Sequence, residues 1–231
     1  MIKTILWDVD GTLLDFEKAQ EICLKKCAAM QGFEVDDEAL RIYDSINKKY
    51  WEMYERGEVT KEKLYPGRYM EWREVVGFKG LDPYRINDNY QDELGKTPIL
   101  REDTIETLTS LKDIVRQYVV TNGSIVAQEN KLKYSGIIDY VDGVFISEKL
   151  KIPKPKKEFF DYVENHIEDY ESDTTVIVGD SLTSDMTGGN IAGIRTIWYN
   201  PERLANNKNV HIDMEIRTLR EVVDIVRKEN G

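Results

Sequence analysis

The distribution of apolar residues along the chain changes character twice. Residues 2–7 form a short apolar run, which predicts a buried strand. From about residue 16 to residue 95, apolar positions recur at helical spacing among many charged residues, and no run is typical of a strand. The clearest helical face in this region consists of Leu40, Tyr43, Ile46, Tyr50 and Met53. We expect this helix to end near Gly57, because glycine commonly terminates helices.

After about residue 98, runs typical of strands alternate with amphipathic segments typical of helices. The expected strands are residues 115–123, 141–147, 174–180 and 195–200. The expected helices are residues 103–114, 124–136, 156–167, 184–193 and 216–229. Such alternation predicts a parallel sheet covered by helices on both faces. The chain is therefore expected to be an α/β protein with a helical segment inserted after its first strand.

Composition narrows the classes of function. The chain has 231 residues, of which 41% are apolar, and its 43 acidic and 32 basic residues give a net charge of −11. This acidic balance argues against binding to nucleic acid polymers or to anionic membranes. Cys23 and Cys27 are expected to be reduced thiols on a helix, and no apolar run is long enough for a membrane span or a signal peptide. We expect a soluble cytoplasmic protein that binds a small molecule, and we leave its oligomeric state open.

Polar residues follow three of the expected strands, at the edge where parallel α/β sheets bind their ligands. These residues are Asp8, Asp10, Thr121, Asn122, Gly123, Asp180 and Asp185, and a loop between two strands adds Lys154. Each pattern alone is common in turns, in helix caps or on the surface. Their joint occurrence at one edge of one sheet predicts a functional site.

Four carboxylates in one site need a cation. Two carboxylates about 4 Å apart repel each other by about 4 kcal/mol at an effective dielectric constant of about 20. Carboxylate ligands without histidine or cysteine favour Mg²⁺. With Mg²⁺ and Lys154, the site would attract a phosphate dianion, whose oxygens would meet the Thr121 hydroxyl and backbone N–H groups near Asn122 and Gly123. An aspartate can then act as the nucleophile and form an aspartyl-phosphate.

Four short segments occur in a fixed order along the chain. They are DVDGT (residues 8–12), TNG (121–123), KP (154–155) and GDSLTSD (179–185). This set resembles the four motifs of the haloacid dehalogenase superfamily. The resemblance covers nearly the whole chain. It implies a Rossmann-like core formed by residues 1–15 and 96–231, with a small helical cap formed by residues 16–95.

The resemblance also implies a role for each motif residue. Asp8 resembles the nucleophile, and Asp10 resembles the general acid–base that protonates the leaving group and later activates water. Mg²⁺ would be held by the Asp8 side chain, the Asp10 backbone carbonyl and Asp180, with support from Asp185 in an outer shell or through water. The residues implied to bind the phosphoryl group are Thr121 and Lys154.

Residues 46–64, 67–69 and 179–201 are similar to pyrimidine 5′-nucleotidases, which hydrolyse nucleoside monophosphates. This similarity implies a Mg²⁺-dependent phosphomonoesterase for nucleoside 5′-monophosphates. In the cap, Asn47, Trp51 and Arg68 become candidate substrate-binding residues: a base would stack on Trp51, and Asn47 would read its edge. Aromatic residues at helical spacing are, however, more often part of a helical core than of a binding surface.

Other activities of related proteins stay open at this point. Asp10 argues against a haloacid dehalogenase, because those enzymes lack this second acid. The alternatives are a sugar-phosphate or phosphoglycolate phosphatase, a phosphoglucomutase-like isomerase, a phosphonatase, and a binding module without catalysis.

Overall fold

The computed structural model describes residues 1–231 and contains one six-stranded sheet with the order β3-β2-β1-β4-β5-β6. The strands are β1 (Thr4–Trp7), β2 (Arg116–Thr121), β3 (Gly143–Ile146), β4 (Thr175–Gly179), β5 (Arg195–Tyr199) and β6 (Met214–Ile216). All neighbouring strands are parallel, as the alternation in the sequence predicts. Because β1 lies between β2 and β4, the residues that follow these three strands meet at one edge of the sheet.

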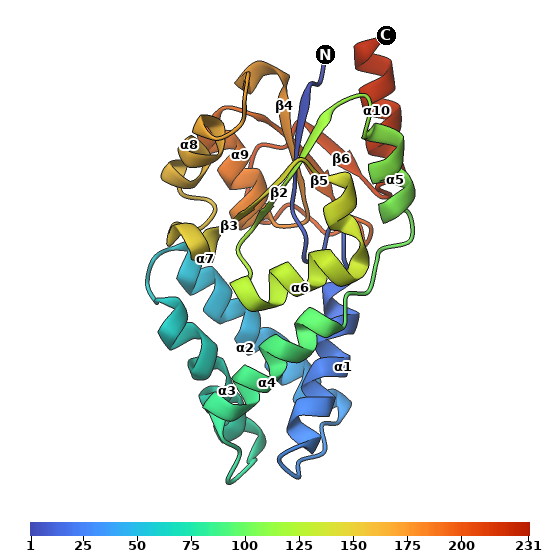
Figure 1. The fold of residues 1–231 in the computed structure, drawn as a ribbon. Coiled ribbons are helices and arrows are strands. Elements are labelled where there is room, and N and C mark those ends of the chain that lie inside the picture. The colour runs from blue at the N-terminus through green and yellow to red at the C-terminus, as the bar shows by residue number, and fades with distance from the viewer.

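Helices cover both faces of the sheet (Figure 1). One face is covered by α5 (Thr104–Leu111), α6 (Ile125–Ser135) and α10 (Arg220–Asn230), and the other by α8 (Lys157–Asn165) and α9 (Thr187–Ala192). Side chains alternate along β1, so Ile5 and Trp7 pack on the first face and Leu6 on the second. The shorter elements are α7 (Ser147–Leu150), η1 (Ile137–Tyr140), η2 (Ser172–Thr174) and the π-helical turn η3 (Leu182–Met186).

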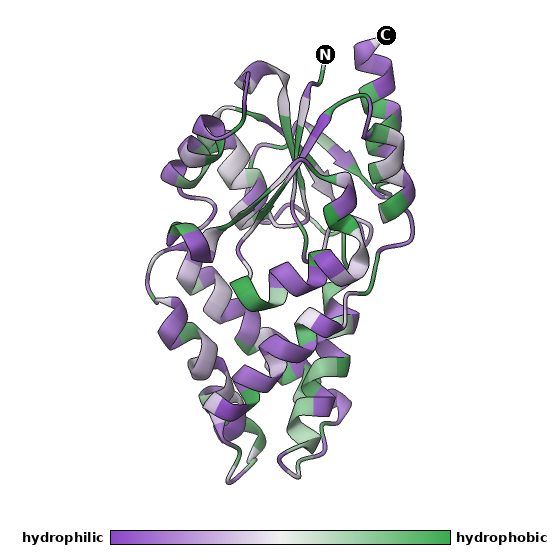
Figure 2. Cartoon of the chain, in the orientation of Figure 1, coloured by the Kyte–Doolittle hydropathy of each residue, from purple (hydrophilic) through white to green (hydrophobic).

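Four helices between β1 and α5 form the helical insertion. They are α1 (Phe16–Ala29), α2 (Asp37–Glu55), α3 (Lys61–Val76) and α4 (Pro83–Lys96). Figure 1 shows them below the carboxyl ends of the strands, and in Figure 2 they alternate between hydrophilic and hydrophobic stretches. Their apolar faces form a separate core rich in packed aromatic rings: Tyr43, Tyr69, Trp72 and Tyr90. The insertion therefore folds around its own centre and covers the edge of the sheet where ligands bind.

One expectation about the chain is met in this insertion, and another is wrong at the C-terminal end. Cys23 and Cys27 are both free and buried. No helix combines the length and the apolar character that a membrane span requires. The predicted single helix over residues 216–229 is wrong at its start, because Met214–Ile216 forms β6 and α10 begins only at Arg220. The limits of the core (1–15 with 96–231) and the cap (16–95) stay a prediction.

Candidate active site

Asp8 directly follows the central strand and lies beside Asp180, which follows the neighbouring strand β4. Asp8 is 7% exposed, and its Oδ2 accepts a hydrogen bond from the Thr12 hydroxyl at 3.2 Å. The same Thr12 oxygen lies 3.3 Å from Asp180 Oδ1 and accepts from the Asp180 backbone N–H at 3.1 Å. Gly11 lies in the turn between Asp8 and Thr12. Its φ is +97°, and a Cβ on this residue would lie 2.5 Å from Asp180 Oδ2. Glycine is required at this turn both for its conformation and for the close approach of the carboxylate.

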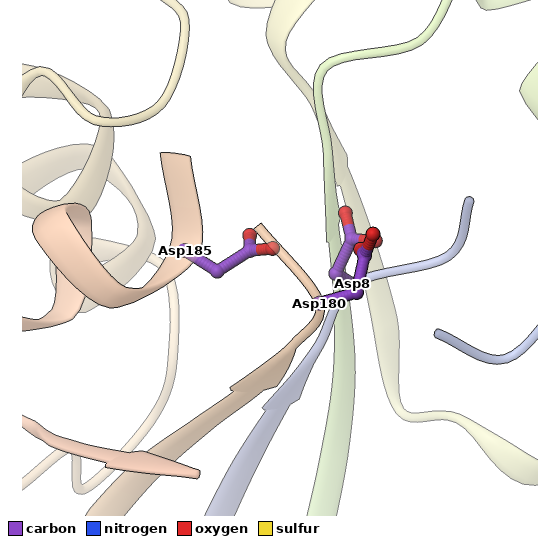
Figure 3. Close-up of side chains that lie close together, drawn as sticks. All are labelled: Asp8, Asp180 and Asp185. Atoms are coloured by element: carbon purple, nitrogen blue, oxygen red, sulfur yellow. The ribbon is translucent and has the colours of Figure 1, made fainter. Parts of the chain in front are cut away.

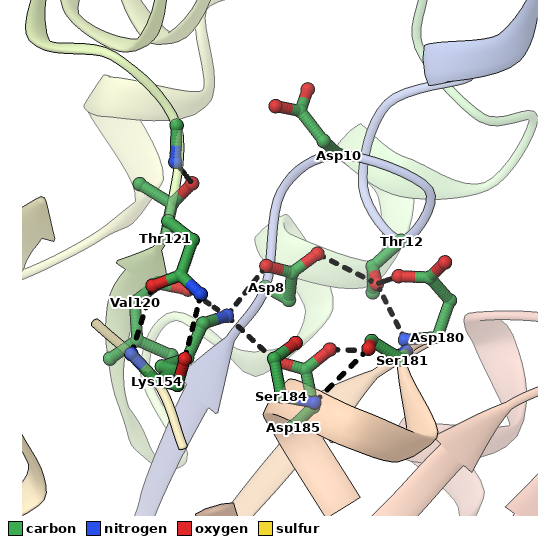
Figure 4. A network of polar contacts seen from close by, with 12 residues as sticks. Asp8, Asp10, Thr12, Val120, Thr121, Lys154, Asp180, Ser181, Ser184 and Asp185 are labelled. Carbon is green, nitrogen blue, oxygen red and sulfur yellow. Dashed lines mark hydrogen bonds and ion pairs between the residues drawn. The ribbon is translucent and has the colours of Figure 1, made fainter. Parts of the chain in front are cut away.

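Lys154 forms ion pairs with two carboxylates, one after β1 and one after β4 (Figure 4). Its ammonium group lies 2.7 Å from Asp8 Oδ1 and 2.6 Å from Asp185 Oδ1, and it donates to the Val120 carbonyl at 2.8 Å. Asn122 fixes the Lys154 backbone from both sides, because its amide donates to the Lys154 carbonyl and accepts from the Lys154 N–H, each at 2.9 Å. Lys154 is 1% exposed, so these contacts replace the water that a charged group loses on burial.

Three carboxylates meet at this edge of the sheet (Figure 3). Oxygen atoms of Asp8, Asp180 and Asp185 all lie within 4.8 Å of one another. Burial raises the pKa of Asp8 to about 7, although Lys154 opposes the shift, and burial together with Asp8 and Asp185 raises the pKa of Asp180. Such crowding is unfavourable without a further cation. The oxygen-only ligand set fits a hard divalent ion such as Mg²⁺.

The ammonium of Lys154 stays positively charged in this cluster. Burial alone would lower its pKa, but Asp185 and Asp8 outweigh that effect and raise it. The site therefore combines a permanent cation with carboxylates that are available to a metal ion.

Thr121 and Gly123 lie on the same cavity as the three carboxylates and are hydrogen-bonded to each other. The Gly123 N–H donates to the Thr121 hydroxyl oxygen at 3.1 Å, and Thr121 is 1% exposed. Thr121, Asn122 and Gly123 all line the same cavity as the aspartates and Lys154. The structure thus brings together the polar residues that the sequence places at three strand ends.

Asp10 has a different environment from Asp8. Its carboxylate points away from the Asp8–Asp180 pair (Figure 4). Its two oxygens each lie 2.6 Å from a donor on α6: Oδ1 from the Lys131 ammonium and Oδ2 from the Gln128 amide. Asp8 and Asp10 therefore have separate partners. Of these two, Asp8 contributes its side chain to the group with Asp180 and Asp185, and Asp10 does not.

The cavity above these groups has a volume of about 250 Å³ and extends to the cap. Trp51 and Arg68 line it on the cap side, as do Tyr90 and Phe16. The Arg68 side chain is 1% exposed, and its guanidinium carbon lies 5.3 Å from the centre of the Tyr90 ring. The cap wall is therefore aromatic with one buried positive charge.

Asn47 does not line this cavity. It is 6% exposed, and its amide is used within the cap: it donates to Gln20 Oε1 at 3.0 Å and accepts from Arg68 Nη1 at 2.8 Å. Asn87 accepts from Arg68 Nη2 at 3.3 Å. Asn47 therefore contacts Arg68 rather than the space where a ligand would lie.

Several residues of the cavity were not candidates on sequence grounds. They are Gln128, Lys131, Glu55, Ser181 and Ser184. Gln128 and Lys131 lie three residues apart on the helix that follows the TNG motif, so they share one face of it. Glu55 follows Trp51 by one turn of α2. A spacing of one helical turn from Trp51 is the signal that would have found Glu55. Gln128 and Lys131 carry no such signal, because α6 contains no residue that the sequence marks as a site candidate.

The fold and this site define a hydrolase class that the sequence comparison identifies. The model of the haloacid dehalogenase-like hydrolase family matches residues 2–193, so the chain belongs to this family and is a hydrolase. It is 31% identical over 228 residues to YfnB of Bacillus subtilis, named as a HAD-hydrolase, covering 99% of this chain and 97% of that one. The YfnB crystal structure, described as bound to magnesium and as revealing interdomain movement, superimposes with a TM-score of 0.92, covering 97% and 98% of the two chains.

Two further relatives carry names of phosphatases. The chain is 32% identical over 230 residues to the pyrimidine 5′-nucleotidase PynA of Streptococcus pneumoniae, with 98% and 95% of the two chains covered. It is 29% identical over 238 residues to a glyceraldehyde 3-phosphate phosphatase of Methanocaldococcus jannaschii, with 98% of each chain covered.

Proposed function

We propose that this chain is a Mg²⁺-dependent phosphomonoesterase that acts through an aspartyl-phosphate on Asp8, with pyrimidine nucleoside 5′-monophosphates as substrates. The observation that carries the proposal is the convergence of Asp8, Asp180 and Asp185 on one point beside Lys154. Mg²⁺, held by these carboxylates and by the Asp10 backbone carbonyl, would supply positive charge to the phosphoryl oxygens.

In the first half of the reaction, an Asp8 carboxylate oxygen forms a bond to phosphorus while the bond from phosphorus to the leaving oxygen breaks. Asp10 gives its proton to that oxygen, so that the alcohol leaves as a neutral molecule. Lys154, which touches Asp8 at 2.7 Å, offsets the charge that gathers around the phosphoryl group. Thr121 and the turn at Asn122 and Gly123 supply hydroxyl and backbone donors.

In the second half, water attacks the phosphorus of the aspartyl-phosphate. Asp10 takes a proton from this water, the bond between Asp8 and phosphorus breaks, and inorganic phosphate leaves. Asp8 and Asp10 then return to their starting states. Asp8 needs its negative charge to attack, and the burial that raises its pKa to about 7 makes nearby positive charge necessary for this.

The cap residues that line the cavity suit a planar substrate group that carries oxygen atoms. Trp51 lies on the cavity and offers an aromatic surface on which a base can stack. The buried Arg68 Nε has no partner within the protein and suits a carbonyl oxygen of a pyrimidine. Asn47 then serves by orienting Arg68, which it contacts at 2.8 Å. The name of PynA agrees with this substrate class.

A screen of phosphomonoesters in the presence of Mg²⁺ tests the proposal. We expect kcat/KM for uridine and cytidine 5′-monophosphates to exceed that for hexose and triose phosphates. A Trp51→Ala variant should raise KM for the nucleotides and leave KM for small sugar phosphates nearly unchanged. A clear preference of the wild type for sugar phosphates would overturn the nucleotide assignment.

A sugar-phosphate phosphatase is the second candidate. The relative named as a glyceraldehyde 3-phosphate phosphatase supports it, since the alignment covers 98% of both chains. The same screen separates the two candidates, because a triose phosphate needs no aromatic surface and its hydrolysis would not depend on Trp51.

A further inference from the structure

Two side chains of α6 hold the Asp10 carboxylate by both oxygens. The Lys131 ammonium lies 2.6 Å from Oδ1, and the Gln128 amide nitrogen lies 2.6 Å from Oδ2. Gln128 is fully buried and Lys131 is 2% exposed. Both line the cavity beside the aspartates. A carboxylate held at both oxygens by buried donors has little freedom to rotate.

The local sequence builds this arrangement. The Ser124 hydroxyl caps α6 by accepting from the Ala127 N–H at 3.2 Å, which fixes the first turn of the helix. Gln128 and Lys131 then follow at a spacing that places them one turn apart on the same face. Gly123 leaves the room that Gln128 needs, because a Cβ there would lie 2.1 Å from the Gln128 amide nitrogen.

These two side chains are not explained by stability. Burying a lysine is costly, and the single acceptor that Lys131 contacts is Asp10. Gln128 leaves its own Oε1 buried without a partner, which is unfavourable for a polar atom. Apolar residues of similar size would fill this space at least as favourably. The polar contacts to Asp10 are therefore the feature that needs a functional account.

The direction of Asp10 gives that account. In phosphoryl transfer, the attacking and leaving oxygens lie roughly in line on opposite sides of phosphorus. A group that protonates the leaving oxygen must therefore sit apart from the nucleophile. The Asp10 side chain points away from Asp8, yet it belongs to a loop, which by itself would not hold one direction (Figure 4).

We propose that Gln128 and Lys131 are positioning residues that fix the Asp10 carboxyl toward the leaving oxygen of the substrate. The proposal rests on the proposed phosphomonoesterase function and adds two residues to its machinery. The Lys131 ammonium also lies 5.2 Å from the centre of the Phe16 ring, so the first residue of α1 packs beside it on the cap side.

The test compares substrates that differ in their need for a proton. Uridine 5′-monophosphate has an alkoxide leaving group that must be protonated, whereas p-nitrophenyl phosphate releases a stable phenolate. In Lys131→Met and in Gln128→Leu, we expect kcat/KM for uridine 5′-monophosphate to fall about 10- to 100-fold and that for p-nitrophenyl phosphate to fall less than about threefold. Because both rates come from the same preparation, partial unfolding would lower them equally.

A double-mutant cycle separates positioning from direct substrate contact. In an Asp10→Asn background, adding Lys131→Met should cause no further loss, because Lys131 acts through Asp10. Lys133→Met, at an exposed position two residues along α6, is the matched control and should leave both substrates unaffected. Equal losses on the two substrates, or a full further loss in the Asp10→Asn background, would overturn the proposal. If the wild type with Mg²⁺ hydrolyses neither ester, the proposed function itself fails, and this inference falls with it.

Discussion

At the scale of single residues, Asp8 carries two opposing demands. It must be negatively charged to attack phosphorus, but it is buried beside two other carboxylates, and its pKa is raised to about 7. Lys154 compensates part of this cost through its contact at 2.7 Å. The protein thus keeps an unfavourable charge where the proposed chemistry needs it.

The Asp8→Asn substitution tests whether this buried charge is needed for activity and is unfavourable for stability. An amide cannot form the acyl phosphate, so we expect phosphatase activity to fall by about 10³-fold or more. The fold should survive, because asparagine has the same shape and removes one charge from a crowded cluster. Activity with p-nitrophenyl phosphate and thermal unfolding in a chelator measure the two effects. Asp173→Asn, at an exposed position, should change neither quantity, and substantial turnover by a folded Asp8→Asn protein would contradict the nucleophile assignment.

Glu55 predicts a pH dependence of stability. Burial raises its pKa from 4.5 to about 7, and its Oε2 is buried without a partner. Because the pKa is raised in the folded state, the contribution of Glu55 to stability is fully present below pH 4.5 and is lost as the pH rises through about 7. Glu55→Gln should therefore stabilise the protein above pH 7 by about 3 kcal/mol and have little effect near pH 4.5.

Urea unfolding at several pH values, with a chelator present so that bound metal does not contribute, measures this difference. Groups that titrate equally in both proteins cancel in the comparison. A difference in the free energy of unfolding that is independent of pH would show that Glu55 does not titrate in this window.

At the scale of elements, the first turn of α3 is attached to the core beside the TNG turn. The Lys61 ammonium donates to the Gly123 carbonyl at 2.8 Å and lies 3.3 Å from Glu148 Oε1. The Tyr65 hydroxyl donates to the same Glu148 oxygen at 2.8 Å, while Glu148 Oε2 accepts from the Ile125 N–H at 2.7 Å. One carboxylate on α7 therefore links the cap to the start of α6.

Glu148→Ala should loosen this junction. With its acceptor removed, the Ile125 amide should exchange with solvent about 10-fold faster, and so should amides in the first turn of α3. Hydrogen exchange followed by mass spectrometry measures this change. Glu129→Ala removes an exposed ion pair with Lys149 on neighbouring helices and is the matched control, for which we expect no effect. Unchanged exchange in Glu148→Ala would show that other contacts hold the cap.

The elements also show what the sequence can and cannot predict. Helical spacing of apolar residues predicts that residues 16–95 are helical, and short apolar runs predict five of the strands, since each carries its own hydrophobic pattern. The strand β6 has three residues and is defined by pairing with β5, so no local pattern predicts it. In the site, residues at strand ends are predictable because a parallel sheet gathers them at one edge. Gln128 and Lys131 are not, because their relation to Asp10 depends on how α6 packs against a loop more than 110 residues earlier in the chain.

At the scale of the whole molecule, negative charge lowers the stability of the fold in two ways: through the net charge of the chain and through the local group of three carboxylates. The chain carries a net charge of −11 spread over its surface, and three carboxylates are concentrated at the centre of the sheet edge. Any salt screens the first kind, whereas only an ion bound between the carboxylates relieves the second. The two contributions are therefore separable by experiment.

Mg²⁺ should stabilise the folded protein beyond the effect of ionic strength. At about 100 times its dissociation constant, a ligand bound only to the folded state adds about 2.7 kcal/mol to the free energy of unfolding. We expect a gain of this size in MgCl₂ relative to NaCl of equal ionic strength. In Asp180→Asn, the gain should fall below about 1 kcal/mol, while stability in a chelator should rise, because one charge of the cluster is gone. Asp173→Asn also removes one negative charge, but from the surface, and should keep the full gain from Mg²⁺. Equal stabilisation by the two salts in the wild type would mean that the carboxylates at the sheet edge do not form a metal site.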